Sequence, residues 1–231
     1  MAQIDERILR FREERVRKIA SGDTPAPLDP TAKMVLHLVP EPAFNGTSYD
    51  LSQLKRDLSN VRPMYPSAWA EMNWSYREGG GEFLTHGQFR GSDNSYSYLL
   101  IQGNGIVEVV NAYLLNPGGG QRFIPRVAYE KELISSLRRF LSVQEAIGVS
   151  PPIVVLLSLI GVSGYTMSPD KLGSTGALVK DENLLLPPGI VEDIEDCEPA
   201  DVFRPAFDAI WQAAGYSHSL NYGESGDWVG Q

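Results

Sequence analysis

The first twenty residues carry apolar side chains at helical spacing among charged ones. Ile4, Ile8, Phe11 and Ile19 fall near one stripe of a helix, and arginines and glutamates occupy most of the remaining surface. Gly22 ends the pattern. This segment therefore predicts an N-terminal amphipathic helix. Because charges run through all of it, we do not expect it to act as a secretory signal peptide.

A proline-rich segment follows this helix. Three prolines lie within the seven residues TPAPLDP, Thr24–Pro30, which cannot continue a helix and favour an extended connector. We expect residues 1–30 to form the helix and connector, and residues 31–231 to form a single domain. The connector would let the helix sit away from the core, so that its apolar stripe meets a partner.

Several later segments are rich in β-branched and aliphatic residues, as is typical of strands. They are Met34–Val39, Phe83–Gln88, Tyr96–Gln102, Ile106–Leu115, Ile153–Ile160 and the shorter Leu184–Pro188. Asn104 and Gly105 stand between two of these segments, and both tolerate positive φ, which predicts a tight hairpin. The nearly continuous apolar run from Ile153 predicts a central strand that is covered on both faces.

Two longer helices are predicted in the second half of the chain. One follows Pro125 and ends at Gly148, and the other spans Ala200–Ala214. A short polar helix is expected at Leu51–Leu58, whereas Val61–Gly81 mixes aromatics with prolines and is predicted to be irregular. The predicted fold is α+β: a mostly antiparallel sheet with a β-hairpin, packed by two main helices, plus the N-terminal amphipathic helix. An alternating α/β fold is the second interpretation.

Composition and charge narrow the class of protein. The chain has 231 residues and a net charge of -9, so its average surface repels nucleic-acid phosphates and direct nucleic-acid binding is not expected. Its longest nearly apolar run, Ile153–Ile160, is too short to span a bilayer. A single cysteine, Cys197, excludes an internal disulfide. We expect a cytoplasmic protein that does not bind membranes.

No group of residues in the sequence identifies a chemistry. His37, His86 and His218 lie far apart, and none has a second metal ligand at the usual zinc spacing. Cys197 stands among acidic residues that disfavour its thiolate, so it is a poor nucleophile. Two glycine clusters lack the lysine of a phosphate-binding loop. The sequence therefore predicts no catalytic residue, no metal and no cofactor.

Aromatic residues gather in and after the segment that is predicted to be irregular. With an arginine as the anchor for an anion, they would line a pocket for a small molecule. The candidate pocket residues are Trp69, Trp74, Tyr76, Tyr96, Arg122 and Arg126. The other interpretation is ordinary core packing, because no basic residues are interleaved with these aromatics as they are in nucleic-acid-binding grooves.

Four stretches along the chain carry a family resemblance: RFREERVRKIASGDTPAPL, MVLHLVPEPAF, VVLLSLIGVSGYTM and FRPAFDAIWQAAGYSHSLNYGESGDWV. Their order resembles the region that follows the DNA-binding domain in bacterial Schlafen-like, AlbA-type DNA-binding proteins, which are often described as ATP-binding. The resemblance implies an accessory half, separately encoded or truncated, without the AlbA-type domain. It carries over no functional residue, because the family's activities belong to that other domain.

Two functions are consistent with these patterns. The first is a non-enzymatic accessory or interaction module of a bacterial nucleic-acid-associated regulatory or defence protein, with an AlbA-type domain protein as partner. Its N-terminal helix would bind the partner through Ile4, Ile8, Phe11, Arg12 and Arg15. The second is a small-molecule or nucleotide-binding sensor or enzyme that uses the aromatic pocket.

Overall fold

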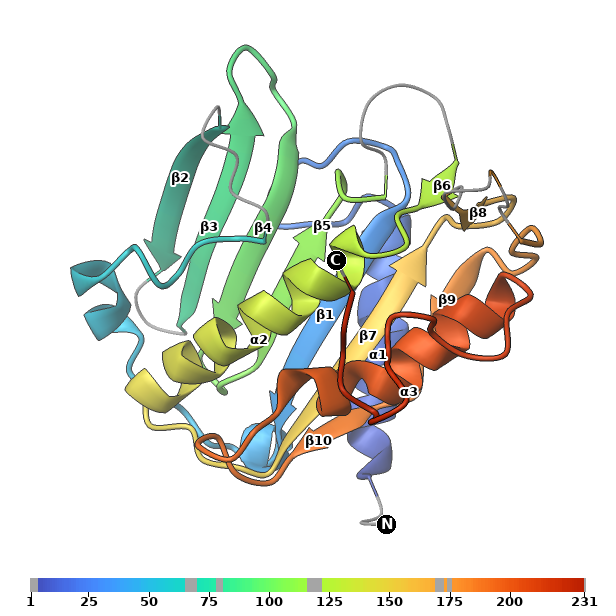
Figure 1. The fold of residues 1–231 in the computed structure, drawn as a ribbon. Helices are drawn as coiled ribbons and strands as arrows, with labels where there is room; N and C mark the ends of the chain where they lie inside the picture. Colours follow the sequence, from blue (N-terminus) through green and yellow to red (C-terminus); the bar gives the residue numbers. More distant parts are fainter. Residues whose placement is uncertain are drawn as a thin grey trace.

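A large antiparallel sheet with helices on both faces organises the computed structural model, which describes residues 4–64, 70–77, 81–115, 122–168, 173 and 176–230 (Figure 1). The strands are β1 (Lys33–Pro40), β2 (Ala70–Arg77), β3 (Glu82–Phe89), β4 (Ser95–Gln102), β5 (Val107–Asn111), β6 (Phe123–Ile124), β7 (Ile153–Ile160), β8 (Thr166–Met167), β9 (Asn183–Leu185) and β10 (Gly189–Val191). The helices are α1 (Glu6–Ala20), α2 (Ala128–Ala146) and α3 (Pro199–Ala213), with the short 3-10 helices η1 (Glu41–Phe44) and η2 (Ser52–Arg56).

The main sheet has eight strands among the described residues. Its order is β10-β7-β1-β5-β4-β3-β2, and β9 also pairs with β7. Every one of these pairings is antiparallel, so the α+β prediction is confirmed and the alternating α/β interpretation is wrong. A separate two-stranded parallel sheet joins β6 to β8.

The hairpin predicted at Asn104 and Gly105 connects β4 to β5. Gln102 donates its backbone N–H to the carbonyl of Ile106 at 2.9 Å, and Gly105 donates to the carbonyl of Gln102 at 2.8 Å. Gly105 has a φ of 86°. Glycine adopts such a positive φ without a steric penalty, which is why its presence predicted the turn. The strand after the turn ends at Asn111, earlier than predicted, because the Asn111 side chain accepts hydrogen bonds from two following backbone N–H groups.

Two strands of the main sheet were missed by the sequence interpretation, as was the two-residue β6 of the small sheet. β2 lies inside the segment predicted to be irregular, yet it pairs with β3 along its whole length, from Ala70 opposite Phe89 to Arg77 opposite Glu82. β10 lies at the start of the acidic run and pairs with β7. They occupy the two ends of the strand order, so they set the edges of the sheet.

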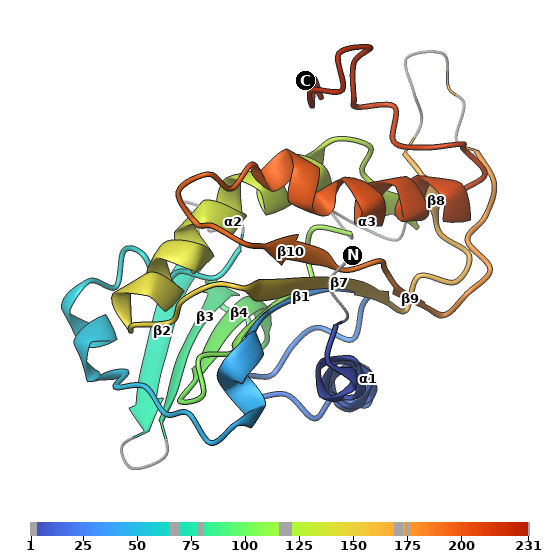
Figure 2. The ribbon, with the colours of Figure 1, turned by 90° about the horizontal axis from the view of Figure 1, so that it is seen from below.

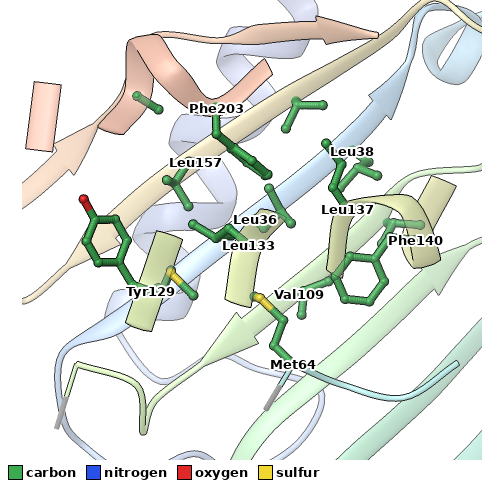
Figure 3. Close-up of a cluster of buried hydrophobic side chains, with 14 of the residues drawn as sticks. Leu36, Leu38, Met64, Val109, Tyr129, Leu133, Leu137, Phe140, Leu157 and Phe203 are labelled. Carbon is green, nitrogen blue, oxygen red and sulfur yellow. The ribbon is translucent and has the colours of Figure 1, made fainter. Parts of the chain in front are cut away.

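The principal core lies between the sheet and the helices α2 and α3. Figure 3 shows Leu133, Leu137 and Phe140 of α2 and Phe203 of α3 pointing toward strand residues such as Leu36. All five side chains are almost completely buried. β7 is buried at each of its positions, as predicted for a central strand.

The opposite face of the sheet is covered by α1, across β1 and β7 (Figure 2). Ile8 and Ile19 are 1% and 0% exposed there. The expectation that the connector holds this helix away from the core is therefore wrong. The connector itself packs against β4: Ala26 is buried, and Ser95 donates its backbone N–H to the carbonyl of Pro27 at 2.7 Å.

Candidate functional site

The apolar stripe of α1 contacts residues of this same chain. Ile8 packs with Val39 and Leu156 of the sheet, and Ile4 and Phe11 lie half-buried against that cluster. The Phe11 ring meets the imidazole of His37 edge-on, with ring centroids 5.2 Å apart. The side chains predicted to bind a partner are thus occupied by internal packing.

Two arginines of α1 are turned inward as well. Arg12 donates from Nη1 to the carbonyl of Leu186 at 2.7 Å. Arg15 donates from Nε and Nη2 to the two carboxylate oxygens of Glu108, at 2.7 and 2.8 Å. Such a bidentate pair fixes both distance and orientation. Both arginines therefore clamp the helix to the sheet and do not belong to an open basic surface.

Glu108 is the centre of a buried polar cluster under α1. Besides Arg15, its carboxylate accepts the hydroxyl of Tyr98 at 2.7 Å, and Nε2 of His37 lies 2.9 Å from Oε2. Burial alone would raise the pKa of Glu108, but the hydrogen bonds from His37 and Arg15 outweigh it and lower the pKa to about 2. Burial also raises the pKa of Tyr98, which keeps its hydroxyl protonated as a donor.

The outward face of α1 carries charges of both signs. Arg10 pairs with Glu6 at 2.8 Å and Lys18 with Glu14 at 2.9 Å, both one helical turn apart. Arg10 and Lys18 are therefore each matched by an acidic neighbour on the same helix.

A second buried carboxylate, Glu130 of α2, lies on the other side of the sheet. It is fully buried, and five neutral donors of the chain reach its two oxygens within 3.0 Å. The donors are the hydroxyls of Tyr129 and Ser219, the indole N–H groups of Trp211 and Trp228, and the amide of Asn221. Three of them lie after α3, so Glu130 anchors the C-terminal segment.

The candidate pocket residues that the structure describes lie in two clusters. Tyr96 of β4 packs against the ring of Phe89, with centroids 4.9 Å apart. Arg126 stacks over the rings of Trp211 and Tyr216, and its Nη2 donates to the Tyr216 hydroxyl at 2.6 Å. Arg122 is exposed at the start of β6. Trp69 lies outside the described residues, as do the side chains of Trp74 and Tyr76.

A small pocket between η2 and the last turns of α2 was not anticipated. It encloses about 210 Å³. Its floor is apolar, formed by Leu54, Val61 and Val143, and the exposed side chains of Arg56 and Asn60 stand at its rim. The apolar spacing of α2 indicates a packed helix face. It does not indicate η2 as the neighbour, because η2 is distant from α2 in sequence.

The described part of the chain contains no group of three or more His, Cys, Asp or Glu residues placed to hold a metal ion. None of its helices is long and apolar enough to cross a membrane. Cys197 is buried, and burial raises the pKa of its thiol, which disfavours the reactive thiolate.

The β2 edge, Ala70–Arg77, is the most distinctive surface feature. No described strand pairs with its outer side, because β2 ends the strand order. Asn73 and Ser75 are exposed, and Asn73 donates from Nδ2 to Oε1 of Gln88 on the neighbouring strand at 2.9 Å. Since no described strand lies beyond it, this Pro-free strand of eight residues ends the sheet with an edge that another strand can join. The alternation of AEMNWSYR was the available sequence signal.

Comparisons of this chain with known protein families, with curated proteins and with solved structures found no match.

Proposed function

We propose that this chain is a non-enzymatic interaction module whose docking surface is the β2 edge. The observation that carries the proposal is that β2 pairs with β3 along its full length while no described strand covers its other side. An extended segment of a partner can add to such an edge through main-chain hydrogen bonds. β2 is already formed as a strand, so this chain loses little conformational entropy when the partner's segment is added.

The state of the two buried carboxylates supports a non-enzymatic role. Glu108 and Glu130 are both fully buried, and both oxygens of each accept hydrogen bonds from the chain's own side chains. A general acid or base must come within hydrogen-bond reach of the proton that it transfers. Neither carboxylate meets that condition, and both hold helices or the C-terminal segment in place.

The proposed setting is a bacterial nucleic-acid-associated regulatory or defence system, with an AlbA-type domain protein as partner. This part of the proposal rests on the resemblance of the four sequence stretches. A net charge of -9 fits an arrangement in which the partner, and not this chain, contacts nucleic acid.

Co-purification from the native host tests the proposal. The full chain is tagged and compared with the double variant Asn73→Lys/Ser75→Lys, which places two charges on the exposed side chains of the β2 edge. The matched control Ser135→Lys/Ser142→Lys adds the same charges to exposed positions of α2. We expect an AlbA-type protein with the wild type and the control, and a loss of at least tenfold with the β2 variant. Equal recovery with all three would contradict the proposal.

The pocket between η2 and α2 favours a second candidate function, a small-molecule or nucleotide-binding sensor. Its apolar floor and the guanidinium of Arg56 at its rim suit a small anion with an apolar part. Thermal-shift measurements with nucleotides and short-chain carboxylic acids test it, since a ligand that binds only the folded state raises the melting temperature. A shift that Arg56→Ala abolishes supports this candidate, and no shift at saturating concentrations rejects it.

A further inference from the structure

We propose that one small monovalent anion of the size of chloride binds between α1 and the sheet, held by Arg12, Ser158 and His37. The site lies where α1 crosses β1 and β7 (Figure 2), away from the β2 edge, so the inference goes beyond the proposed function. Each residue has a buried polar atom without a hydrogen-bond partner among the described residues: Nε of Arg12, Oγ of Ser158 and Nδ1 of His37. Buried polar groups are rarely left unpaired in native proteins, so such a set points to a ligand.

The strand register brings Ser158 and His37 together. Ser158 of β7 lies between Leu156 and Ile160, which both pack on the α1 side, so its side chain is on that side too. His37 of β1 is opposite Leu156, which makes Ser158 its diagonal neighbour. Diagonal neighbours are about 7–8 Å apart, within reach of an aromatic side chain. Because Nε2 of His37 is directed to Glu108 on β5, Nδ1 is directed away from β5, toward β7.

Arg12 lies at the same level of the interface. The apolar residues one turn before and one turn after it belong to the same buried clusters as the β7 residues two positions before and two positions after Ser158. Nη1 of Arg12 donates to the carbonyl of Leu186 at 2.7 Å, and the preceding residue, Leu185, pairs with Ser158. The guanidinium of Arg12 is therefore next to Ser158, on the face that carries its hydroxyl.

The balance of charge favours an anion over a water molecule. Two guanidinium groups, of Arg12 and Arg15, lie on this side of the sheet beside the carboxylate of Glu108, which Arg15 engages through both oxygens. Within the described ranges, no carboxylate forms an ion pair with Arg12, which is only 9% exposed. Burial lowers the pKa of Arg12, as expected of a cation without a matching charge. A water molecule would complete the hydrogen bonds, whereas an anion also neutralises a buried charge that is costly when unpaired.

The three unpartnered atoms can all donate to one ion. Nε of Arg12 and the hydroxyl of Ser158 are donors. Nε2 of His37 donates to the ionised carboxylate of Glu108, so Nδ1 donates as well when the ring carries both protons. An anion beside Nδ1 favours that form, since the imidazolium then lies between two negative charges. Because all three residues are buried beneath α1, the ligand we infer is a single small ion.

Thermal unfolding of the full chain at constant ionic strength tests the site, with sodium chloride exchanged for sodium gluconate, whose anion is much larger. An ion that binds only the folded state raises the melting temperature. We expect the wild type to melt at a higher temperature in chloride, and Arg12→Met and Ser158→Ala to lose at least half of that difference. The matched control Arg10→Met removes an exposed guanidinium from the same helix and should keep it, because general salt effects act on both variants alike.

Crystals grown in sodium bromide locate the ion, because bromide scatters X-rays anomalously. We expect an anomalous peak within hydrogen-bond reach of Nε of Arg12 and Oγ of Ser158. A peak there without any difference in melting temperature between chloride and gluconate marks an adventitious ion only and overturns the inference. A water molecule in place of the peak, or the same chloride effect in Arg12→Met as in Arg10→Met, overturns it too. If Arg12→Met does not fold, Ser158→Ala, which removes a single hydroxyl, decides by the same comparison.

Discussion

Arg15 of α1 and Glu108 of β5 are joined by two hydrogen bonds, 2.7 Å from Nε to Oε2 and 2.8 Å from Nη2 to Oε1. The two residues are 93 positions apart in sequence. Their pairing fixes the first helix to the middle of the sheet, where His37 and Tyr98 complete the shell of the carboxylate. The first helix is therefore part of the domain, and its basic residues are structural.

Removing the charge of Glu108 should destabilise the fold strongly. The change Glu108→Gln leaves the guanidinium of Arg15 mostly buried without a carboxylate, and breaking a buried pair in this way costs about 3–5 kcal/mol. Urea unfolding at pH 7 measures the loss. The matched control is Glu6→Gln, which breaks an exposed pair with Arg10 and should change stability little. A loss no greater than that of the control would contradict the role of the cluster.

Stability should fall in acid through Glu108. Its folded-state pKa of about 2 lies below the unfolded value of about 4.3, so its contribution is present above pH 4.3 and is lost as the pH falls toward 2. The difference corresponds to about 3 kcal/mol. Between pH 6 and pH 2, the free energy of unfolding should fall less steeply with pH for Glu108→Gln than for the wild type. If it falls equally steeply in both proteins, the pKa of Glu108 is not lowered.

Truncating the apolar stripe of α1 should weaken the whole domain. The double change Ile8→Ala/Phe11→Ala removes one buried and one half-buried side chain, and an Ile-to-Ala change in a core alone costs about 2–5 kcal/mol. We expect a lower urea midpoint with an unchanged slope. Arg10→Ala/Arg17→Ala, on the exposed face of the same helix, is the control. Equal midpoints for both double variants would place the stripe outside the core.

Glu130→Gln should loosen the C-terminal segment. An amide offers one acceptor oxygen in place of two, so part of the shell formed by Trp211, Trp228 and Asn221 is left without an acceptor, and hydrogen bonds to a charged group are worth about 1.5–3 kcal/mol each. Limited proteolysis should cut residues 216–230 faster in this variant than in the wild type. Glu145→Gln, in the last turn of α2, is the control. Equal cutting rates in all three proteins would refute the anchor.

The sequence predicted correctly those elements that are determined by residues close together in the chain. The β4–β5 hairpin follows from Asn104 and Gly105, because the turn needs positive φ and these residues tolerate it. β7 follows from its continuous apolar run. In both cases the residues that decide the structure are neighbours in the chain, so the prediction needed no knowledge of the fold.

Features that depend on distant residues were not predictable in the same way. An amphipathic stripe shows that one face of α1 is buried, but not against what, and Arg12 and Arg15 gave no sign that Leu186 and Glu108 accept their hydrogen bonds. The anchor of Trp228 on Glu130 spans 98 positions. β2 was not predicted because aromatic residues and prolines surround it in the sequence. Its alternation of apolar and polar residues is typical of a strand, but the pairing with β3 that makes it one depends on residues outside the segment.

The use of the β2 edge as a docking surface is tested most directly by amide hydrogen exchange of the full chain, alone and in complex with the protein that co-purifies with it. A partner segment that adds to β2 should slow exchange in residues 70–77, because outward N–H groups of β2 gain acceptors. β10, Gly189–Val191, ends the strand order on the other side and serves as the internal reference. Slower exchange in 70–77 of the complex with no change in 189–191 is the predicted result, and equal exchange in 70–77 with and without the partner would contradict it.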